Sequence, residues 1–462
     1  MQQNTISFKD LQISWGQLLL DTETPISLYE RVRRDSPFSF LFESVESGNN
    51  VGRYSLVGWG ARRQFIGLPS ESNVLARLDA LIQSYQGLDV LPFNGFFGYL
   101  AYESVHEMEP TVPADLASLN VPLAMFWLPE VLVVFDKLAH EVTWIENAEF
   151  GAVQPDIESH VRDVLCRSLQ MTPFLGVGVS HRDLVPKSNC TQSQFESMVK
   201  QAKDYILSGD IFQVVLSQRF SSDYAGDPFT IYRHLCSLNP SPYMFYMEMA
   251  NHGVLLGTSP EIMLRKEGET LTIRPIAGTR QRGLTQAEDL AIEKELLADE
   301  KENAEHIMLV DLARNDLNRV ADPQTVKLEA YQTIERYSHV MHIVSSVTGI
   351  MRQDQTVLEA VKATFPAGTL SGAPKVRAMQ IIQELEAEPR GTYGGLVGYF
   401  GLNGQFDSCI TIRSVRVKEG QAYVQAGAGI VADSDPSKEY EETVNKAKGM
   451  FKAIERAIEE PS

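Results

Sequence analysis

Four glutamates stand in two pairs on segments with helical character. Glu302 and Glu305 are three residues apart, and Glu439 and Glu442 repeat this spacing near the end of the chain. Residues three apart on a helix project from the same side, so each pair would present two carboxylates together. Mg²⁺ takes one or two protein carboxylates and completes its octahedron with water and an anionic substrate. The spacing therefore predicts a magnesium site, although it equally fits a solvated helix face.

Two further residues could carry proton or anion chemistry. His342 lies among apolar residues in RYSHVMHIVSSVTG, and a neutral imidazole can act as a general base near pH 7. Arg413 follows the strand-like sequence CITI, where a guanidinium could hold a carboxylate through two parallel hydrogen bonds. A structural histidine in the core and an exposed or ion-paired arginine remain open as alternatives.

Two glycine-rich segments could expose backbone N–H groups to an anion. They are Gly278-Thr279 in RPIAGTRQRG and Gly427 to Gly429 in VQAGAGIVAD. Neither has the spacing of a nucleotide-binding loop. Tight turns use glycine in the same way, so the pattern alone does not choose between a turn and a binding segment.

Composition excludes several classes of function. The 462 residues carry 41 basic and 60 acidic side chains, a net charge of −19, which would repel an extended nucleic acid. Four widely spaced cysteines predict reduced thiols. The first residues lack the pattern of a leader, and the longest apolar stretch, residues 121–135, is interrupted by Pro and Glu. We expect a cytoplasmic protein that binds neither nucleic acid nor membrane.

The pattern along the chain indicates two regions. Residues 1–171 read as short strands with a few helices, residues 172–192 as a linker rich in Pro, Gly, Ser and Asn, and residues 193–462 as a second region. A capping box of Ser193 and Glu196 predicts the helix that opens the second region. Further helices are predicted over residues 286–316 with a break, 357–364, 374–386 and 440–458, and strands over 211–220, 395–402, 408–417 and 421–431.

Several long segments of the second region resemble the chorismate-utilising enzymes. They include GDIFQVVLSQRF, GTSPEIML, RPIAGTRQRG, ENAEHIMLVDLARNDL, TFPAGTLSGAPK, DSCITIR and QAGAGIVADSDPSKEYEETVNKA. The family resemblance covers nearly all of residues 193–458. It implies an α/β (α+β) fold in which a large two-sheet antiparallel β sandwich is flanked by helices, and to which the N-terminal region contributes.

The resemblance also implies a role for each candidate residue. It implies a site for Mg²⁺ and chorismate whose residues act as follows: Glu305 and Glu442 as metal ligands, with Glu302 and Glu439 as possible further ligands; His342, Glu261, Thr369 and Gln213 as catalytic residues; and Gly278, Thr279, Tyr393, Arg413, Gly427, Ala428 and Gly429 as substrate-binding residues.

Two positions distinguish branches of this family. Relatives that add water at C2 have a basic Lys where this chain has Gln213, and an amide can orient ammonia but cannot deprotonate water. Aminodeoxychorismate synthases, which serve the p-aminobenzoate branch, commonly have a nucleophilic Lys where this chain has Ala277. The resemblance therefore favours the members that make anthranilate and pyruvate from chorismate and ammonia at the start of tryptophan biosynthesis. The p-aminobenzoate branch and a non-catalytic tryptophan-binding relative are the alternatives.

The resemblance implies a partner and an effector as well. No segment resembles a glutamine amidotransferase, so a separate glutaminase subunit is expected to supply ammonia. Tryptophan is the expected inhibitor, bound by Glu43 and Ser44 of a segment similar to the family's LLES and by Pro242, Tyr243 and Met244. Phe42 departs from the family segment, and a larger side chain could alter a pocket built for an indole ring.

Overall fold

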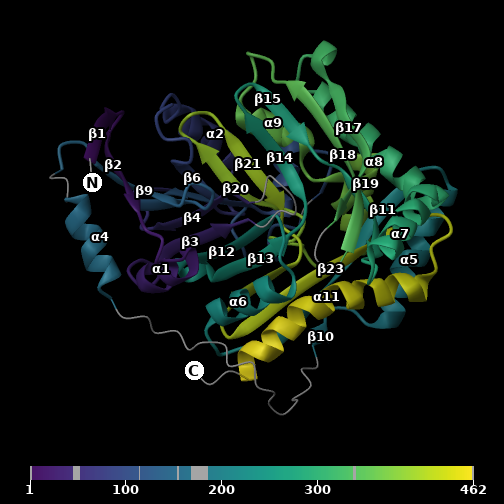
Figure 1. The fold of residues 1–462 in the computed structure, drawn as a ribbon. Coiled ribbons are helices and arrows are strands. Elements are labelled where there is room, and N and C mark those ends of the chain that lie inside the picture. The colour runs from purple at the N-terminus through teal and green to yellow at the C-terminus, as the bar shows by residue number, and fades with distance from the viewer. Residues whose placement is uncertain are drawn as a thin grey trace.

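A computed structural model describes residues 3–44, 52–113, 115–152, 156–167, 186–336 and 340–459. Within these residues the chain forms two antiparallel sheets of unequal size, flanked by helices (Figure 1). We call them the large sheet and the small sheet. This arrangement confirms the predicted fold class.

The large sheet contains thirteen of the described strands in the order β1-β2-β9-β8-β4-β3-β12-β13-β22-β23-β11-β10, and the short strand β19 also pairs with β11. Its strands are β1 (Gln3–Phe8), β2 (Leu11–Leu19), β3 (Phe38–Glu43), β4 (Tyr54–Trp59), β8 (Val131–Asp136), β9 (Glu141–Glu149), β10 (Lys187–Ser188), β11 (Gln213–Asp223), β12 (Tyr243–Met249), β13 (Val254–Ser259), β19 (Gly372–Ala373), β22 (Ser414–Lys418) and β23 (Gln421–Ile430).

The small sheet contains ten of the described strands in the order β16-β18-β15-β14-β21-β20-β6-β7-β5, and β17 also pairs with β18. Its strands are β5 (Arg63–Gly67), β6 (Gly95–Leu100), β7 (Ala124–Leu128), β14 (Ile262–Glu267), β15 (Thr270–Ile273), β16 (Ile276–Gln281), β17 (Lys327–Arg336), β18 (Val340–Ile350), β20 (Leu396–Gly401) and β21 (Phe406–Ile410).

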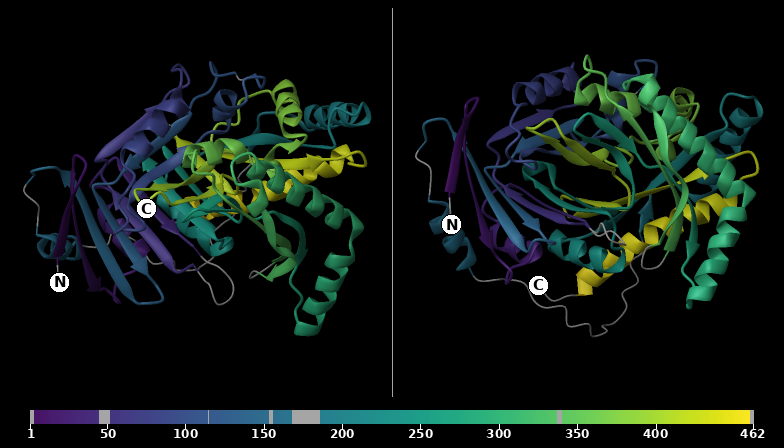
Figure 2. Two further views of the ribbon diagram at one scale, coloured as in Figure 1. Left: turned by 90° about the horizontal axis from the view of Figure 1, so that it is seen from above. Right: turned by 45° about the horizontal axis from the view of Figure 1, so that its top comes forward.

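The N-terminal region and the second region each contribute strands to both sheets. In the large sheet β3 pairs with β12, and in the small sheet β6 pairs with β20. The two sheets face each other (Figure 2, right), and their facing side chains form the largest core. There the ring of Phe40 in the large sheet stacks on the ring of Phe97 in the small sheet, with centroids 4.2 Å apart. Most of the predicted linker lies outside the described residues, so the division at residues 172–192 stays a prediction.

The helices cover the outer faces of the sheets. The final helix, α11, packs on β23 and α6 along the large sheet (Figure 1), and its Phe451 and Ile454 enter a second core there. The helix α8 packs on β16 and β18 of the small sheet. The helices are α1 (Pro25–Val32), α2 (Val74–Ser84), α3 (Val105–Met108), α4 (Ile157–Leu165), α5 (Gln192–Leu207), α6 (Pro228–Leu238), α7 (Gln286–Ala298), α8 (Glu300–Asn318), α9 (Val357–Thr364), α10 (Lys375–Leu385) and α11 (Pro436–Glu459).

The predicted start of α5 is wrong by two residues. Thr191 is the N-cap, because its hydroxyl accepts a hydrogen bond from the Gln194 N–H while the Gln194 side chain accepts one from the Thr191 N–H. Ser193 and Glu196 have the same spacing, so the sequence allows both starts. Pairing of residues 187–188 with β11 fixes the chain just ahead of Thr191. In the described part of the chain, no helix is both long and apolar enough to cross a membrane.

Candidate active site

His342 lies on the middle one of three adjacent strands of the small sheet. On β18 it stands opposite Thr279 of β16 and Glu335 of β17, and opposed residues of antiparallel strands project to the same side. His342 Nδ1 lies 3.1 Å from Thr279 Oγ1 and 3.1 Å from the carbonyl oxygen of Gly278. Because a carbonyl oxygen can only accept, Nδ1 carries the proton and Nε2 is the basic nitrogen.

The surroundings of His342 keep it neutral. Burial lowers the pKa of the imidazole, the backbone bond to Gly278 raises it, Arg413 lowers it and Glu335 raises it. Gly278 lies at a bulge in β16 and has a φ of +63°, which glycine adopts without strain. Gly278 therefore lies in a bulge within a strand and not in a tight turn, and its carbonyl oxygen faces His342. Its predicted role in substrate binding stays a prediction.

Glu261 and Thr369 form a second pair. Glu261 lies between β13 and β14, and Thr369 lies in a short 3₁₀ helix over Gly368–Leu370. The Thr369 hydroxyl donates a hydrogen bond of 2.8 Å to Glu261 Oε1. Burial raises the pKa of Glu261 to about 7, although the Thr369 bond and the charge of Lys446 oppose the rise. A large fraction of this carboxyl group is therefore protonated near neutral pH and able to donate a proton.

Gln213 at the start of β11 meets Glu305 of α8. Gln213 Nε2 donates to Glu305 Oε1 over 3.4 Å. Burial and the charge of Glu302 raise the pKa of Glu305, while the Gln213 bond and Lys446 lower it. Gly429 leaves room for this amide, because a Cβ at that position would lie 2.7 Å from Gln213 Nε2. The amide and the carboxylate thus share one side of the site.

Glu439 and Glu442 of α11 lie near Lys446, which also influences Glu305. Glu442 forms an ion pair with Lys446 at 2.7 Å. Burial raises the pKa of Glu439, and the charge of Glu442 raises it further. Lys446 also lowers the pKa values of Glu439 and Glu305. Lys446 of α11 therefore acts electrostatically on acids of both α8 and α11.

Glu302 differs from these acids in being paired with an arginine. Its Oε1 accepts a hydrogen bond of 3.0 Å from Arg280. Among the residues that the structure describes, no three His, Cys, Asp or Glu side chains are arranged to hold a metal ion by themselves. Glu305 and Glu442 would supply two carboxylate ligands, and an incomplete protein shell of this kind suits Mg²⁺, which keeps water and substrate oxygen as its other ligands.

Arg413 does not lie on a strand, contrary to the prediction. β21 ends at Ile410, β22 begins at Ser414, and Arg413 between them has a φ of +50°. A non-glycine residue in this conformation carries strain on the order of 1 kcal/mol. The guanidinium donates a 3.0 Å hydrogen bond to the Lys446 carbonyl oxygen, and burial lowers its pKa. It makes no ion pair with any described residue, so it can receive a carboxylate.

Tyr393 and the glycines of β23 line another side of the site. Gly427, Ala428 and Gly429 lie within the strand rather than in a turn, and Ala428 faces the core under α5 and α10. The Tyr393 phenol hydrogen-bonds the backbone of Gly427, where an added Cβ would lie 2.9 Å from the phenol oxygen. The two glycines keep the backbone of this face open to the phenol and to an anionic ligand.

Sequence reasoning missed Lys446. Its ammonium group bridges Glu442 and the carbonyl oxygen of Gly427, the latter at 2.9 Å. The spacing of four residues between Glu442 and Lys446 was a visible signal, because such pairs meet on a helix. Its connection to β23 depends on how α11 crosses the large sheet, which the sequence does not reveal.

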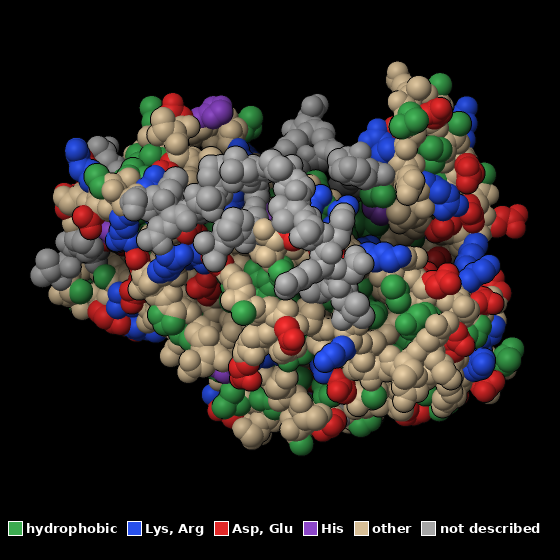
Figure 3. Space-filling view, turned by 90° about the horizontal axis from the view of Figure 1, so that it is seen from below, with side chains coloured by type: hydrophobic (Ala, Val, Ile, Leu, Met, Phe, Trp, Pro, Cys, Tyr) green, Lys and Arg blue, Asp and Glu red, His purple; other side chains and the backbone are tan. Residues whose placement is uncertain are grey.

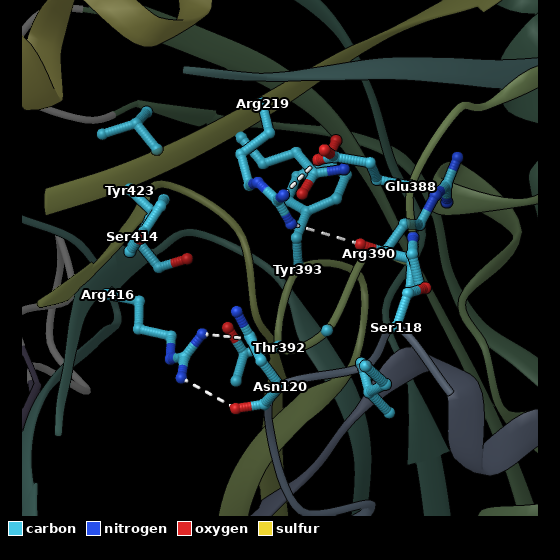
Figure 4. A pocket seen from close by; sticks show the side chains of 15 residues that line it. Ser118, Asn120, Arg219, Glu388, Arg390, Thr392, Tyr393, Ser414, Arg416 and Tyr423 are labelled. Atoms are coloured by element: carbon cyan, nitrogen blue, oxygen red, sulfur yellow. Dashed lines mark hydrogen bonds and ion pairs between the residues drawn. The ribbon is translucent and has the colours of Figure 1, made fainter. Parts of the chain in front are cut away.

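Arg390 was also missed. Its buried guanidinium pairs with Glu386 at 2.6 Å and donates to the carbonyl oxygens of Leu370 and Val215. Leu370 follows Thr369, and Val215 lies two residues after Gln213. Arg390 therefore connects its own segment to the segments that carry Thr369 and Gln213. Figure 4 shows it in the wall of a pocket beside Tyr393. In EPRGTYGG an arginine next to Pro and Gly gives no sign of burial.

The five residues predicted to bind an effector line a separate cavity of about 800 Å³. Glu43 of β3 pairs with Met244 of β12 in the large sheet, and the Tyr232 hydroxyl donates to Glu43 at 2.9 Å. Tyr243 donates to Asp407 at 2.7 Å. Phe42, Ser44 and Pro242 complete this part of the lining. The structure therefore brings the predicted effector residues together in one cavity, whose lining includes Glu335, the residue opposite His342 on β17, but not His342 or Glu305 themselves.

Comparisons with known proteins agree with one another. A family model described as chorismate binding enzyme matches residues 37–452. The chain is 44% identical to anthranilate synthase component 1 of Aquifex aeolicus, over 96% of this chain and 95% of the relative, and 43% identical to that of Acetivibrio thermocellus over the same shares. Anthranilate synthase component I from Streptococcus pneumoniae is 36% identical and superposes with a TM-score of 0.77 over 88% of this chain and 94% of its own. The isochorismate synthase MenF from Escherichia coli, 19% identical over 98% of this chain and 96% of its own, shares the fold with a TM-score of 0.74.

Proposed function

The chain belongs to the chorismate-binding enzyme family, and from this premise we propose that it converts chorismate and ammonia into anthranilate, pyruvate and water as the large subunit of an anthranilate synthase. One observation carries the proposal: an imidazole whose pKa is lowered, a carboxyl group whose pKa is raised to about 7, and a guanidinium without an ion pair among the described residues influence one another electrostatically. The charge of Arg413 lowers the pKa of His342, and the charge of Lys446 lowers the pKa of Glu261. The backbone carbonyl oxygen of Lys446 accepts a hydrogen bond from Arg413.

The carboxylates of α8 and α11 suit Mg²⁺. Burial and neighbouring negative charge raise the pKa values of Glu305 and Glu439, which means that the site lacks enough positive charge for its acids. Glu305 and Glu442 would hold the ion, with Glu439 as a further ligand directly or through water. The bound ion would supply positive charge to the ring carboxylate of chorismate. Glu302, paired with Arg280, is the weakest of the four candidates.

The other carboxylate of chorismate would be held by the groups at the turn before β22 and on β23. Arg413 offers a buried guanidinium, and Tyr393 offers a phenol beside the backbone of Gly427 and Gly429. Charge acts strongly in a site that excludes water. This explains how a chain with a net charge of −19 can bind a dianion.

Amination requires an oriented ammonia molecule and a proton donor. The Gln213 side chain can orient ammonia by hydrogen bonding, and it lies beside the metal carboxylate Glu305. As the nitrogen bonds to C2, the C4 hydroxyl leaves. Glu261, protonated and hydrogen-bonded by Thr369, would donate the proton that lets this group leave as water.

Aromatisation requires loss of pyruvate and of the C2 proton. His342 Nε2 would take that proton, because Nδ1 is fixed as the donor by the Gly278 carbonyl oxygen and Thr279 holds the ring beside it. A His342→Met variant should therefore accumulate the aminated ring without releasing anthranilate. Release of anthranilate at the rate of the parent protein would disprove this role.

Ala277 argues against amination at C4. It lies on β16 opposite Ile343 and offers no amine that could form a covalent adduct with the ring. Aminodeoxychorismate synthase component I of the p-aminobenzoate branch is therefore the second candidate. A tryptophan-binding relative without activity is the third, but it would have no need for the complete set of acid, base and carboxylates.

We also propose a partner, an inhibitor and a compartment. A separate glutaminase subunit would deliver ammonia, tryptophan would bind in the 800 Å³ cavity that contains Glu43 and Met244, and the enzyme would act in the cytoplasm. The chain alone should use ammonium but not glutamine, with a rate that rises with the fraction of free ammonia. Turnover of glutamine by the purified chain would contradict the proposal that a separate subunit releases ammonia from glutamine.

The function is tested by incubating the purified chain with chorismate, ammonium and Mg²⁺. Anthranilate, detected by its fluorescence and by mass, is the expected product. Release of 4-amino-4-deoxychorismate would select the p-aminobenzoate branch. An absence of turnover together with saturable tryptophan binding would select the non-catalytic relative.

A further inference from the structure

A further pocket has Tyr393 in its lining but not His342. It has a volume of about 290 Å³, and its walls come from the segment around Asn120, the segment 388–393, and the strands β11, β22 and β23 (Figure 4). Tyr393 is the one proposed substrate-binding residue in its lining. The pocket is large enough for a small ring compound, and the proposed function does not use it.

The charges around this pocket are unbalanced. Arg219 forms an ion pair with Glu388 (Figure 4). Arg390 forms one with Glu386, which lies outside the lining. Arg416 of β22 forms no ion pair with any described residue. The lining of the pocket therefore has one positive charge more than these two carboxylates neutralise.

Arg416 is held rigidly but is not compensated. Its guanidinium donates to the side-chain oxygen of Asn120 at 2.7 Å and to the backbone oxygen of Asn120 at 3.1 Å. Its Nε is buried and has no hydrogen-bond partner among the residues that the structure describes. Burial lowers the pKa of Arg416, and the charge of Arg219 lowers it further. A charge that is partly desolvated without a counterion is costly and attracts an anion.

The rest of the lining selects the shape of that anion. The side chains of Tyr393 and Tyr423 contribute aromatic rings, and Leu119, Pro389 and Val424 contribute apolar surface. Aromatic rings favour stacked or edge contacts with another ring, and a guanidinium binds a carboxylate better than it binds a neutral group. We propose that this pocket binds a small aromatic carboxylate, with its carboxylate on Arg416 and its ring between Leu119 and Tyr423, as a site separate from the substrate site.

Benzoate is the probe for this proposal, and calorimetry on the full chain is the measurement. The parent protein should bind benzoate saturably, and binding should persist when chorismate fills the substrate site. Arg416→Met should weaken binding at least about tenfold, because it removes a charge-assisted contact. Arg416→Lys should weaken it less. Arg162→Gln, which removes an exposed arginine on α4, should leave binding unchanged.

A second variant covers the possibility that Arg416→Met does not fold. Ser118 lies on the exposed rim of the pocket, and Ser118→Trp should block benzoate while leaving Arg416 in place. The melting temperature of each variant shows whether it is folded where binding is measured, because Arg416→Met also removes the two hydrogen bonds to Asn120. The proposal is overturned if benzoate does not bind the parent protein, if it binds Arg416→Met equally well, or if chorismate displaces it completely.

Discussion

Glu261 is a carboxyl group whose surroundings favour its protonated form. The folded protein raises its pKa from 4.5 to about 7, so the folded state holds this proton more tightly than the unfolded chain does. Its contribution to stability is therefore lost as pH rises from about 4.5 through 7, at a cost of up to about 3 kcal/mol at pH 8. The group that would donate the proton in catalysis thus makes the fold less stable above neutral pH.

Glu261→Gln should separate these two effects. The amide keeps the size of the side chain and can still accept from Thr369, so we expect the melting temperature to rise relative to the parent at pH 8 but not at pH 4.5. Turnover should fall by about 10²- to 10⁴-fold, because the proton donor is lost. Calorimetry at the two pH values and a chorismate assay check both parts. An equal change in melting temperature at both pH values would contradict the raised pKa.

The pKa of His342 depends on its neighbour Glu335 across the strand pair. The charge of Glu335 raises the pKa of the imidazole, so Glu335→Gln should lower it. A base is active when unprotonated, and the acidic limb of the profile of kcat against pH should therefore move to lower pH. Glu329→Gln on the same strand is the control, because Glu329 pairs with Lys327 instead. An unmoved limb in Glu335→Gln would mean that His342 is not the group that titrates.

The sequence identifies residue types better than it identifies their surroundings. His342, Arg413 and the glutamates could be selected from their chemistry alone. The φ of +50° at Arg413 could not be predicted, because the alternation of CITIR continues through the break between β21 and β22. Nor could the pairing of Glu302 with Arg280, since 22 residues separate them in the chain.

At the scale of elements, α8 and α11 carry the candidate acids, and Lys446 of α11 lowers the pKa of Glu305 on α8 as well as that of Glu439 on α11. If Glu305 holds Mg²⁺, Glu305→Gln should raise the Mg²⁺ concentration needed for half-maximal activity by about tenfold or more. Glu302→Gln on the same helix should change it much less, because Glu302 is already paired with Arg280. Titration of activity with Mg²⁺ compares the two variants. Equal shifts would contradict the assignment of the ligands.

The Arg390–Glu386 pair joins the element that carries Thr369 to the one that carries Gln213. Both side chains are almost fully buried, at 1% and 6% exposure. Arg390→Met leaves Glu386 buried without its partner, and we expect a loss of about 3–5 kcal/mol in the free energy of unfolding. Arg219→Met removes an exposed ion pair with Glu388 and should cost less than about 1 kcal/mol. Urea denaturation measures both, and equal losses would show that burial is not what matters here.

Periodicity predicts elements well where one face is buried. The helix α9 has the predicted bounds, and the predicted break between residues 286 and 316 occurs at Asp299, which caps α8. Local patterns fail where two solutions are equivalent, as at the start of α5. At the glycines of β23 the predicted strand over residues 421–431 is confirmed, and the alternative of a turn is wrong. Such choices are decided by contacts between segments distant in the sequence.

At the scale of the whole molecule, acidic and basic side chains are interspersed on the face shown in Figure 3. The net charge of −19 is therefore not concentrated in one acidic patch on that face. The cationic groups that we propose to act in the site, at Arg413 and Lys446, are only partly exposed to solvent. The two sheets unite the N-terminal region with the rest of the chain, and α7 and α8 extend beyond them (Figure 2, left). The family resemblance anticipated this architecture, whereas composition alone indicated only a globular α/β protein.

The central claim is that this site adds ammonia, not water, at C2 of chorismate. The most direct test supplies the purified chain with chorismate, Mg²⁺ and ¹⁵N-labelled ammonium and locates the label by NMR. We predict ¹⁵N on the ring carbon next to the carboxylate-bearing carbon, in anthranilate, with one pyruvate released for each label incorporated. A label on C4, or a hydroxylated product without nitrogen, would contradict the roles assigned to Gln213, Ala277 and the site as a whole.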